Sequence, residues 1–360
     1  MLLTSRALRS SVVPFVCIAL AACSTSTQPQ DTGTQNMDAS SMTDTPAAMD
    51  VPVDNPLQMQ DDVPQVDVPP AAAHDYASSI GPIHLNPGDE VTMCVIRRLG
   101  NDTAQFVRSA SAMLGNSSHH LIFYRSQVTT EQLTPTPCNG FSGLQNFTMP
   151  DTPFLIAQNQ NASIEYPSGT GMHIEANQMV RIELHAINVT SAPVDVSANV
   201  QLHTVDDTVP LIPADLLFWG NTNISIPPHS TADVHFFHRP WPSVRVFGLT
   251  SHTHSHGTLA TINVATNDTT DSAMSTDLME VHRSLSWSDP PLTRFDPPLQ
   301  LESGQGFHLD CHYNNTTDQT LTFGESFNDE MCFMWAYYYP APRGLQICGD
   351  YGRGVVCYPP

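Results

Sequence analysis

Three groups of histidines contain the residues of this chain that are best suited to bind a metal ion. The sequence has 16 histidines in 360 residues, and their spacing says more than their number. The groups are the adjacent pair His119 and His120, the single His185, and the alternating run His252, His254 and His256. Neutral imidazole binds copper, zinc, iron and nickel, so these groups predict metal chemistry without choosing the metal.

The His252-x-His254 spacing is the clearest of these signals. Residues two apart in a strand lie on the same face, so His252 and His254 can present two imidazoles to one ion. His256 extends the same face, and a three-histidine zinc or copper site made of His252, His254 and His256 is a competing interpretation. A solvent-exposed polar strand face is the alternative that needs no metal.

His119 and His120 would point to opposite faces of a regular strand. Both can bind one ion only at a strand end or a bulge, where the backbone turns one side chain round. Asn116, Ser117 and Ser118 precede the pair, and a strand could begin there. Taken alone, an adjacent histidine pair is more often structural or exposed, and His185 by itself is a weaker signal still.

Short strands should position these histidines. From residue 80 onward the sequence shows alternating apolar runs, rich in β-branched residues and separated by Pro or Gly clusters. The 30 prolines disfavour long helices, and the best helical candidates, 103–114 and 213–219, are short. An all-β fold of antiparallel sandwiches is therefore expected. Predicted strands cover 91–96, 120–124, 180–185, 194–200, 234–237, 243–249, 259–264, 307–313, 320–323 and 331–339.

The N-terminal residues have the pattern of an export signal. Arg6 and Arg9 precede an apolar run over 12–22, which is shorter than the roughly 20 residues that a spanning helix needs. Leu-Ala-Ala-Cys at 20–23 resembles the lipobox of bacterial lipoproteins, so residues 1–22 should be a signal peptide and Cys23 the lipidated residue. An ordinary signal with an incidental Cys23 is the alternative.

Two composition changes divide the rest of the chain. Residues 23–79 are rich in Asp, Pro, Thr, Gln and Met and show no periodicity, so we expect a disordered acidic linker. A seam near 204–213 contains Asp206, Asp207, Pro210 and Pro213. We therefore expect one β-sandwich domain over 80–207 and a second over 208–360.

Cysteine usage and charge narrow the functional classes. Export would place the chain in an oxidising compartment. Six cysteines follow Cys23, an even number that is consistent with three disulfides, but their number does not decide which cysteines pair. The set is Cys94, Cys138, Cys311, Cys332, Cys348 and Cys357. A formal charge of −22 argues against nucleic acid as a partner, because phosphate binding needs clustered cations.

The ordered set of motifs resembles the copper type II, ascorbate-dependent monooxygenases, the family of dopamine β-monooxygenase and peptidylglycine α-hydroxylating monooxygenase. The motifs are His119-His120 opening an apolar strand, Leu184-His185, His252-Thr253-His254 ahead of a glycine, and Asp329-Glu330-Met331-Cys332 leading into Tyr337-Tyr338-Tyr339-Pro340. The resemblance covers about residues 80 to 350.

The resemblance implies two copper ions per chain, held on two β-sandwich domains that face each other across a solvent-filled cleft. His119, His120 and His185 match the ligands of the electron-transfer copper. His252, His254 and Met331 match the ligands of the copper that activates dioxygen. A thioether favours Cu(I), whereas without this context Met331 would be read as a core methionine.

The resemblance also bears on the disulfides and the substrate. Cys311 and Cys332 match a disulfide of the family, Cys348 and Cys357 are close enough to pair locally, and Cys94 would be left with Cys138. Thr250 and Trp335 stand where the peptide-processing member has an arginine and a tyrosine for a substrate carboxylate. A carboxylate-ended peptide is therefore not the expected substrate, and the segment after Met331 looks closer to the dopamine branch.

The expected function is hydroxylation of an activated C–H bond of a small organic substrate, with dioxygen and ascorbate or another one-electron reductant. We expect a monomer, lipid-anchored in the bacterial cell envelope on the periplasmic or outer-surface side. A copper-binding envelope lipoprotein without turnover, for storage, delivery or sensing, is the alternative from another class. A structural lipoprotein with ordinary surface histidines is the third.

Overall fold

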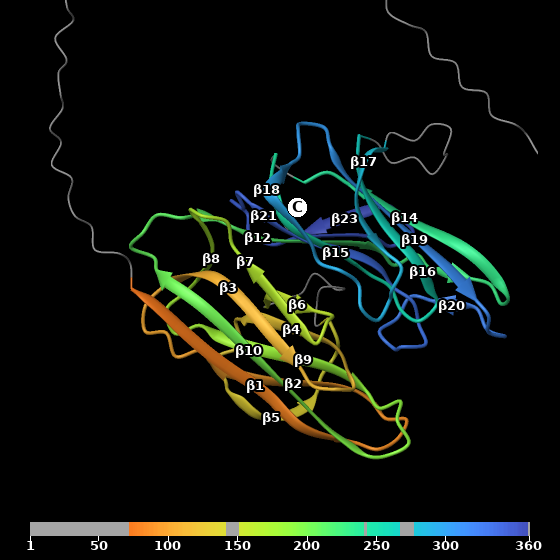
Figure 1. Ribbon diagram of the computed structural model, residues 1–360, viewed down its shortest axis with the longest axis horizontal. Helices are drawn as coiled ribbons and strands as arrows, with labels where there is room; N and C mark the ends of the chain where they lie inside the picture. Colours follow the sequence, from red (N-terminus) through yellow and green to blue (C-terminus); the bar gives the residue numbers. More distant parts are fainter. Residues whose placement is uncertain (1–71, 142–150, 241–242, 267–276, 359–360) are drawn as a thin grey trace, which may run out of the picture. The chain divides into compact units, whose positions relative to one another are not determined.

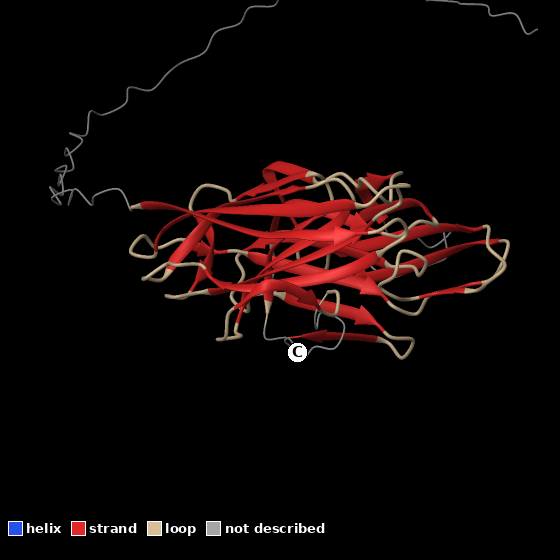
Figure 2. Ribbon diagram, turned by 90° about the horizontal axis from the view of Figure 1, so that it is seen from below, coloured by secondary structure: helices blue, strands red, loops and turns tan. Residues whose placement is uncertain are grey.

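The computed structural model describes residues 72–141, 151–240, 243–266 and 277–358. These residues form strands and loops and include no helix (Figure 2). In the same part of the chain, no helix has the length and apolarity that crossing a membrane requires. The predicted all-β class is therefore confirmed, and Figure 1 shows how the strands are arranged.

The first half of the described chain forms two sheets. One, the first outer sheet, has the order β1-β10-β3-β8-β11, with β7 pairing with β3. Its strands are β1 (Ala73–Leu85), β3 (Gln105–Leu114), β7 (Asn161–Glu165), β8 (Thr170–Ile174), β10 (Val194–Asp206) and β11 (Ile212–Pro213). The other, the first inner sheet, has the order β5-β2-β9-β4-β6. Its strands are β2 (Glu90–Arg98), β4 (Ser118–Ser126), β5 (Gln132–Pro137), β6 (Thr152–Ala157) and β9 (Met179–Ile187).

The second half repeats this plan. The second inner sheet has the order β18-β15-β21-β12-β22-β23, and the second outer sheet has the order β14-β19-β16-β17. The inner strands are β12 (Asp215–Asn221), β15 (Arg245–His252), β18 (Thr293–Gln300), β21 (Cys332–Tyr339), β22 (Gln346–Asp350) and β23 (Val355–Tyr358). The outer strands are β14 (Ser230–His238), β16 (Gly257–Ala265), β17 (Asp277–Ser284) and β19 (Gly306–Asn315). A small ladder joins β13 (Ser225–Ile226) and β20 (Leu321–Thr322).

Burial explains why the inner strands read as continuous apolar runs. All eight residues of β21 are buried, whereas β10 alternates buried and exposed residues along most of its length. A strand covered on both faces has no solvent side, so it loses the period of two. Phe218, Trp335 and Tyr337 of the second inner sheet belong to the same apolar core as Leu121 and Phe123 of the first inner sheet. The two inner sheets therefore pack against each other.

Each predicted strand overlaps an observed one, although 320–323 lies only half within β20, and the two helical candidates were wrong. Residues 103–114 and 213–219 overlap β3 and β12 instead. In β3 the small residues Ala110 and Ala112 are buried in the sandwich core, and the packing of a sheet overrides a weak local preference.

The expected linker boundary also needs correction. Residues 73–79 were assigned to the linker, but they lie in β1 and pair with β10 from Ala73↔Val205 to Ser79↔Asn199. Their polar composition fits an outer strand with one solvent face. The remainder of the linker, the signal segment and Cys23 lie outside the described residues. The division at 207/208 stays a prediction.

Three disulfides join the six expected cysteines. Cys94–Cys138 ties β2 to the segment after β5, and Cys348–Cys357 joins the neighbouring strands β22 and β23. Cys311–Cys332 connects β19 of the second outer sheet to the first residue of β21 in the second inner sheet. The last of these fixes the strand that begins immediately after Met331.

Candidate metal centre

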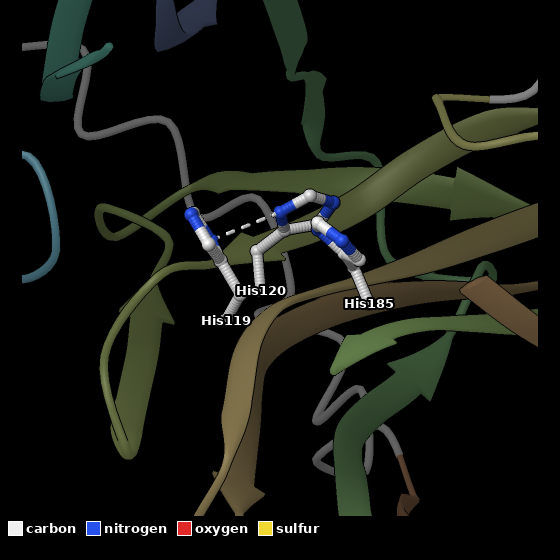
Figure 3. A group of neighbouring side chains, drawn as sticks. All are labelled: His119, His120 and His185. Atoms are coloured by element: carbon white, nitrogen blue, oxygen red, sulfur yellow. Dashed lines mark hydrogen bonds between the residues drawn. The ribbon is translucent and has the colours of Figure 1, made fainter. Parts of the chain in front are cut away.

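His119, His120 and His185 form one compact group on the first inner sheet. One nitrogen of each ring lies within 4.8 Å of the others, and Figure 3 shows the three rings side by side. The register of β4 against β9 shifts between Ser118 and His120, and Ser117 has a positive φ of 70°. This irregularity is the bulge that two adjacent histidines need, since it brings the Nδ1 atoms of His119 and His120 to 3.4 Å from each other.

His252 and His254 lie where the second inner sheet ends. His252 is the last residue of β15, and His254 follows it in the link to β16. Their ring centroids are 5.1 Å apart. The N–H of Gly257 donates to the His254 carbonyl at 3.0 Å, and a Cβ at Gly257 would lie 2.3 Å from the Thr253 hydroxyl. The glycine after the His-x-His pair therefore permits the tight turn that holds His254.

The two histidine groups are contiguous. The His119 centroid lies 6.0 Å from that of His252 and 5.9 Å from that of His254, and the His120 and His252 centroids are 5.9 Å apart. His120, His185, His252 and His254 are each at most 3% exposed. In this structure the groups do not face each other across a solvent-filled cleft, as the resemblance implied, because the packed inner sheets bring both strand ends to one place.

Hydrogen bonds fix which nitrogen of each ring in the second group is available. Nδ1 of His252 pairs with the Gln158 side-chain oxygen, and Nδ1 of His254 pairs with the Asp329 carbonyl at 3.0 Å. Since both partners are acceptors, each Nδ1 carries the proton and each Nε2 has a free lone pair. Metal-binding histidines usually have one nitrogen held by an acceptor in this way.

Unsatisfied nitrogen atoms mark this cluster as one that could hold a metal. Among the residues that the structure describes, the Nε2 atoms of His119, His120, His252 and His254 are buried without a hydrogen-bond partner. A buried polar atom left unpaired costs free energy, so such atoms normally have a partner. The donor set consists of imidazoles, which suits copper.

Burial keeps these imidazoles neutral. Desolvation, reinforced by neighbouring histidines, lowers the pKa of His119 to about 3 and those of His120 and His252 well below the usual value. Desolvation also lowers the pKa of His254 to about 4. Neutral imidazole is the form that binds a metal, so the rings are ready to act as ligands near neutral pH.

Met331 is 2% exposed and lies directly before β21. β15 and β21 are antiparallel, and their ladder ends with His252 opposite Phe333, so Met331 lies two residues before the last pair. The adjacent Glu330 accepts the backbone N–H of His254, which brings the segment of Met331 to the turn that contains this histidine. The Tyr313 hydroxyl donates to the Met331 carbonyl at 2.6 Å and fixes the backbone there.

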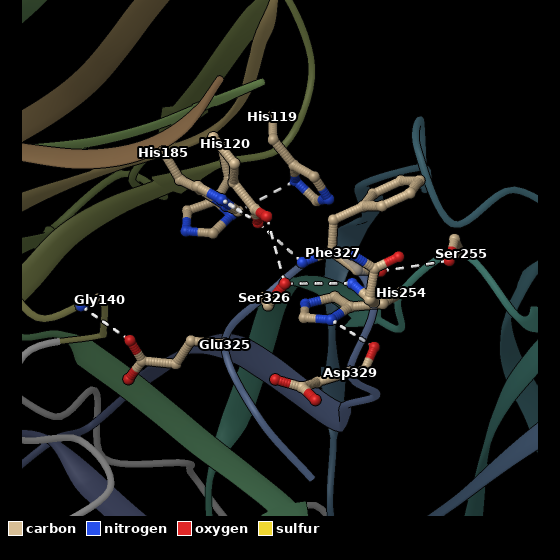
Figure 4. A network of polar contacts seen from close by, with 12 residues as sticks. His119, His120, Gly140, His185, His254, Ser255, Glu325, Ser326, Phe327 and Asp329 are labelled. Atoms are coloured by element: carbon tan, nitrogen blue, oxygen red, sulfur yellow. Dashed lines mark hydrogen bonds and ion pairs between the residues drawn. The ribbon is translucent and has the colours of Figure 1, made fainter. Parts of the chain in front are cut away.

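Two carboxylates that sequence reasoning missed connect the histidines to the loop before Met331. Glu90 accepts hydrogen bonds from Nε2 of His185 at 3.0 Å and from the Phe327 N–H at 2.8 Å. Glu330 accepts the backbone N–H groups of His254 at 3.0 Å and His256 at 2.7 Å. Figure 4 shows His254, Ser326, Phe327 and Asp329 beside the three-histidine group.

The charge states of these carboxylates differ because their surroundings differ. The hydrogen bond from His185 is the largest cause that lowers the pKa of Glu90 to about 2. Burial raises the pKa of Glu330 to about 7. No local pattern marks Glu90 or Gln158 in the sequence, and Glu330 lies in the quoted Asp329-Glu330-Met331-Cys332 motif without a predicted role, since the partners of all three are far away along the chain.

The alternative site made of His252, His254 and His256 does not form. Among the described residues, these three do not come together as a group of possible ligands. His256 is half-buried in the turn after His254, and its backbone N–H pairs with Glu330. Because β15 ends at His252, the side chains after it no longer alternate between two faces, and His256 is not aligned with His252 and His254.

Comparison with known proteins finds one family similarity, in the second half of the chain. Residues 230–355 match the family model described as copper type II ascorbate-dependent monooxygenase, C-terminal domain. This range contains His252, His254, Met331 and the Cys311–Cys332 disulfide, and over it the resemblance drawn from the motifs is confirmed. No curated protein matches the chain significantly.

The solved structures with detectable similarity are distant. The STIV MCP has a TM-score of 0.31 at 11% identity, over 74% of this chain and 96% of that chain. PBCV-1 VP54, fitted into a reconstruction of the virophage Sputnik, has a TM-score of 0.21 at 9% identity, over 81% and 98%. The VP2 subviral particle of infectious bursal disease virus has a TM-score of 0.15 at 11% identity, over 78% and 75%. Likenesses this weak carry no argument about fold or function.

Proposed function

We propose that this chain, whose residues 230–355 match the family model of the copper type II ascorbate-dependent monooxygenase C-terminal domain, is a copper-dependent monooxygenase. It would hydroxylate an activated C–H bond of a small organic substrate, using dioxygen and an external reductant such as ascorbate. The observation that carries the proposal is the cluster of five histidines, four of them buried, in which four Nε2 atoms have no hydrogen-bond partner among the described residues.

Each group of residues has a separate task in this proposal. His119, His120 and His185 would hold one copper ion, and His252, His254 and Met331 would hold the other. Copper supplies one-electron transfer and the activation of dioxygen when it is bound at these residues. The chain itself fixes the tautomers through Glu90, Gln158 and the Asp329 carbonyl.

A cavity beside the second group offers space for a substrate. It has a volume of about 280 Å³, and its lining includes Gln158, Thr250, Leu292 and Trp335. The Trp335 ring centroid lies 6.1 Å from that of His252, so a molecule in this cavity would lie beside the proposed oxygen-activating group. Trp335 and Leu292 favour an apolar body, while Gln158 and Thr250 can bind one polar group.

We further propose that the protein acts as a monomer, anchored in a bacterial cell envelope through a lipid on Cys23. The Leu-Ala-Ala-Cys sequence at 20–23 supports the anchor. The three disulfides support an oxidising compartment, the periplasm or the outer surface. Nucleic acid is not a proposed partner, given the formal charge of −22.

The test is oxygen transfer by the copper-loaded full chain. The protein is supplied with ascorbate, ¹⁸O-labelled dioxygen and small aromatic or heteroatom-bearing compounds with an activated C–H bond. We expect label in a hydroxylated product. His252→Gln should abolish incorporation, whereas His256→Gln, which changes a histidine outside the cluster, should keep it.

The opposite result would favour the alternative function. If the chain binds copper but its reductant-dependent oxygen consumption equals that of His252→Gln, the monooxygenase proposal fails. A role in copper storage, delivery or sensing would then account for the same ligands.

A further inference from the structure

A second cluster of metal-binding side chains lies on the second outer sheet. His235 on β14 is directly opposite Asp310 on β19, and His308 precedes Asp310 by two residues on the same face of β19. One ligand atom of each residue lies within 4.8 Å of the others. The strand register alone therefore brings two imidazoles and one carboxylate together.

Both imidazoles approach the same carboxylate oxygen. Nδ1 of His235 is hydrogen-bonded to Oδ1 of Asp310, and Nε2 of His308 lies 3.6 Å from that oxygen. The two rings are stacked, with centroids 5.9 Å apart and planes inclined by 28°. A divalent ion could replace the proton between His235 and Asp310 with small shifts of these side chains.

Other His–Asp pairs of the chain show what is unusual here. His84–Asp195, His203–Asp75 and His229–Asp318 join one histidine to one carboxylate, and their side chains are 53 to 94% exposed. At the cluster, the side chains of His308 and Asp310 are only 5% and 14% exposed. Exposed pairs of this kind contribute little to stability, whereas a buried group of three ligands is costly unless it is well paired.

We propose that His235, His308 and Asp310 form a binding site for a divalent transition-metal ion, with zinc as the expected occupant. Two imidazoles and one carboxylate are a common zinc donor set, with a water completing the tetrahedron. The set contains no soft sulfur ligand, so it does not share the preference for Cu(I) expected at Met331.

The site has a defined place in the fold. Asp310 precedes Cys311, whose disulfide to Cys332 fixes the start of β21 next to Met331. Zinc bound between β14 and β19 would therefore stabilise the sheet to which the methionine segment is tied. This role is independent of the proposed oxygen chemistry.

The test is zinc uptake by the full chain after copper loading and reduction, so that the histidine cluster between the inner sheets is occupied. The protein is dialysed against micromolar zinc, and its zinc content is measured by mass spectrometry. We expect wild type to retain one zinc ion more per chain than His308→Gln. His312→Gln changes the next outward-facing histidine of β19, which pairs with Asp233, and should retain the zinc.

Two results would overturn the proposal: equal zinc content in wild type and His308→Gln, or loss of zinc from His312→Gln alone. If His308→Gln does not fold, His235→Gln replaces it, because the His235 side chain is 25% exposed and tolerates change more easily. Anomalous scattering at the zinc edge gives a check that needs no variant, since the peak must lie between His235, His308 and Asp310. The comparison with His308→Gln holds even if the copper proposal is wrong.

Discussion

At the residue scale, hydrogen-bond partners determine which ring nitrogen of a clustered histidine can bind a metal. Glu90 holds Nε2 of His185, so Nδ1 is the nitrogen left to bind a metal at this ring. Gln158 holds Nδ1 of His252, so Nε2 is the one left there. The His185 and His252 rings thus have different supporting residues, although Glu90 also accepts the Phe327 N–H of the loop before Met331.

Exchanging these supporting residues should weaken one copper site at a time. Glu90→Gln removes the negative charge beside His185 and should lower copper affinity of the three-histidine group by about 10- to 100-fold. Gln158→Leu should have an effect of similar size on the group of His252 and His254. Competition titrations with a Cu(I) chelator measure both. If either variant weakens both groups equally, the hydrogen bonds do not act separately.

The chain should lose stability as the pH is lowered, because His282 is buried in its neutral form. This histidine is buried between the Ser251 and Thr293 hydroxyls, and burial lowers its pKa from 6.5 to about 4. The unfolded chain takes up the proton first as pH falls through 6.5, so stability is lost between pH 6.5 and about 4. The loss from this residue is on the order of 3 kcal/mol.

The measurement is denaturant unfolding of the metal-free chain from pH 7 to pH 4. His282→Gln should show a shallower decline than wild type over that window. The exposed His229 gives a matched control, since His229→Gln should leave the decline unchanged. A His282→Gln curve parallel to wild type would mean that this histidine is not buried in its neutral form.

At the element scale, the sequence predicted most strands because their β-branched runs and Pro or Gly boundaries are local signals. For His119 and His120 the sequence required either a strand end or a bulge, and the register shift between Ser118 and His120 is the bulge. The start of β1 was missed because Ala73–Ser79 is polar and resembles the segment before it. Glu90 was missed because the pairing of β2 with β9 brings it to His185, and Gln158 was missed because the packing of the inner sheets brings it to His252.

The corrected start of β1 predicts two different outcomes for truncation. Deleting 24–71 should leave the melting temperature unchanged, because that segment lacks core-forming residues. Deleting 24–79 removes the pairing from Ala73↔Val205 to Ser79↔Asn199 and should lower the melting temperature by several degrees. Calorimetry of both forms decides this. Equal melting temperatures would show that this end of β1 contributes nothing to stability.

At the scale of the whole unit from Asp67 to Pro360, the packing of two inner sheets accounts for the site. β4 and β9 contribute His119, His120 and His185, while β15 and its following turn contribute His252 and His254. The ends of these strands meet because Phe218, Trp335 and Tyr337 share one core with the first inner sheet. This contact could not be predicted from the sequence, since an apolar run does not indicate which element covers it.

X-ray absorption at the copper edge, on the reduced, copper-loaded full chain, tests directly whether Met331 binds copper. Met331→Ile keeps about the same volume and should cost under about 1.5 kcal/mol, so the variant should fold. We expect a copper–sulfur scattering shell in wild type that is absent from Met331→Ile, while the histidine scattering from the first group remains. A wild-type spectrum without the sulfur shell would contradict it.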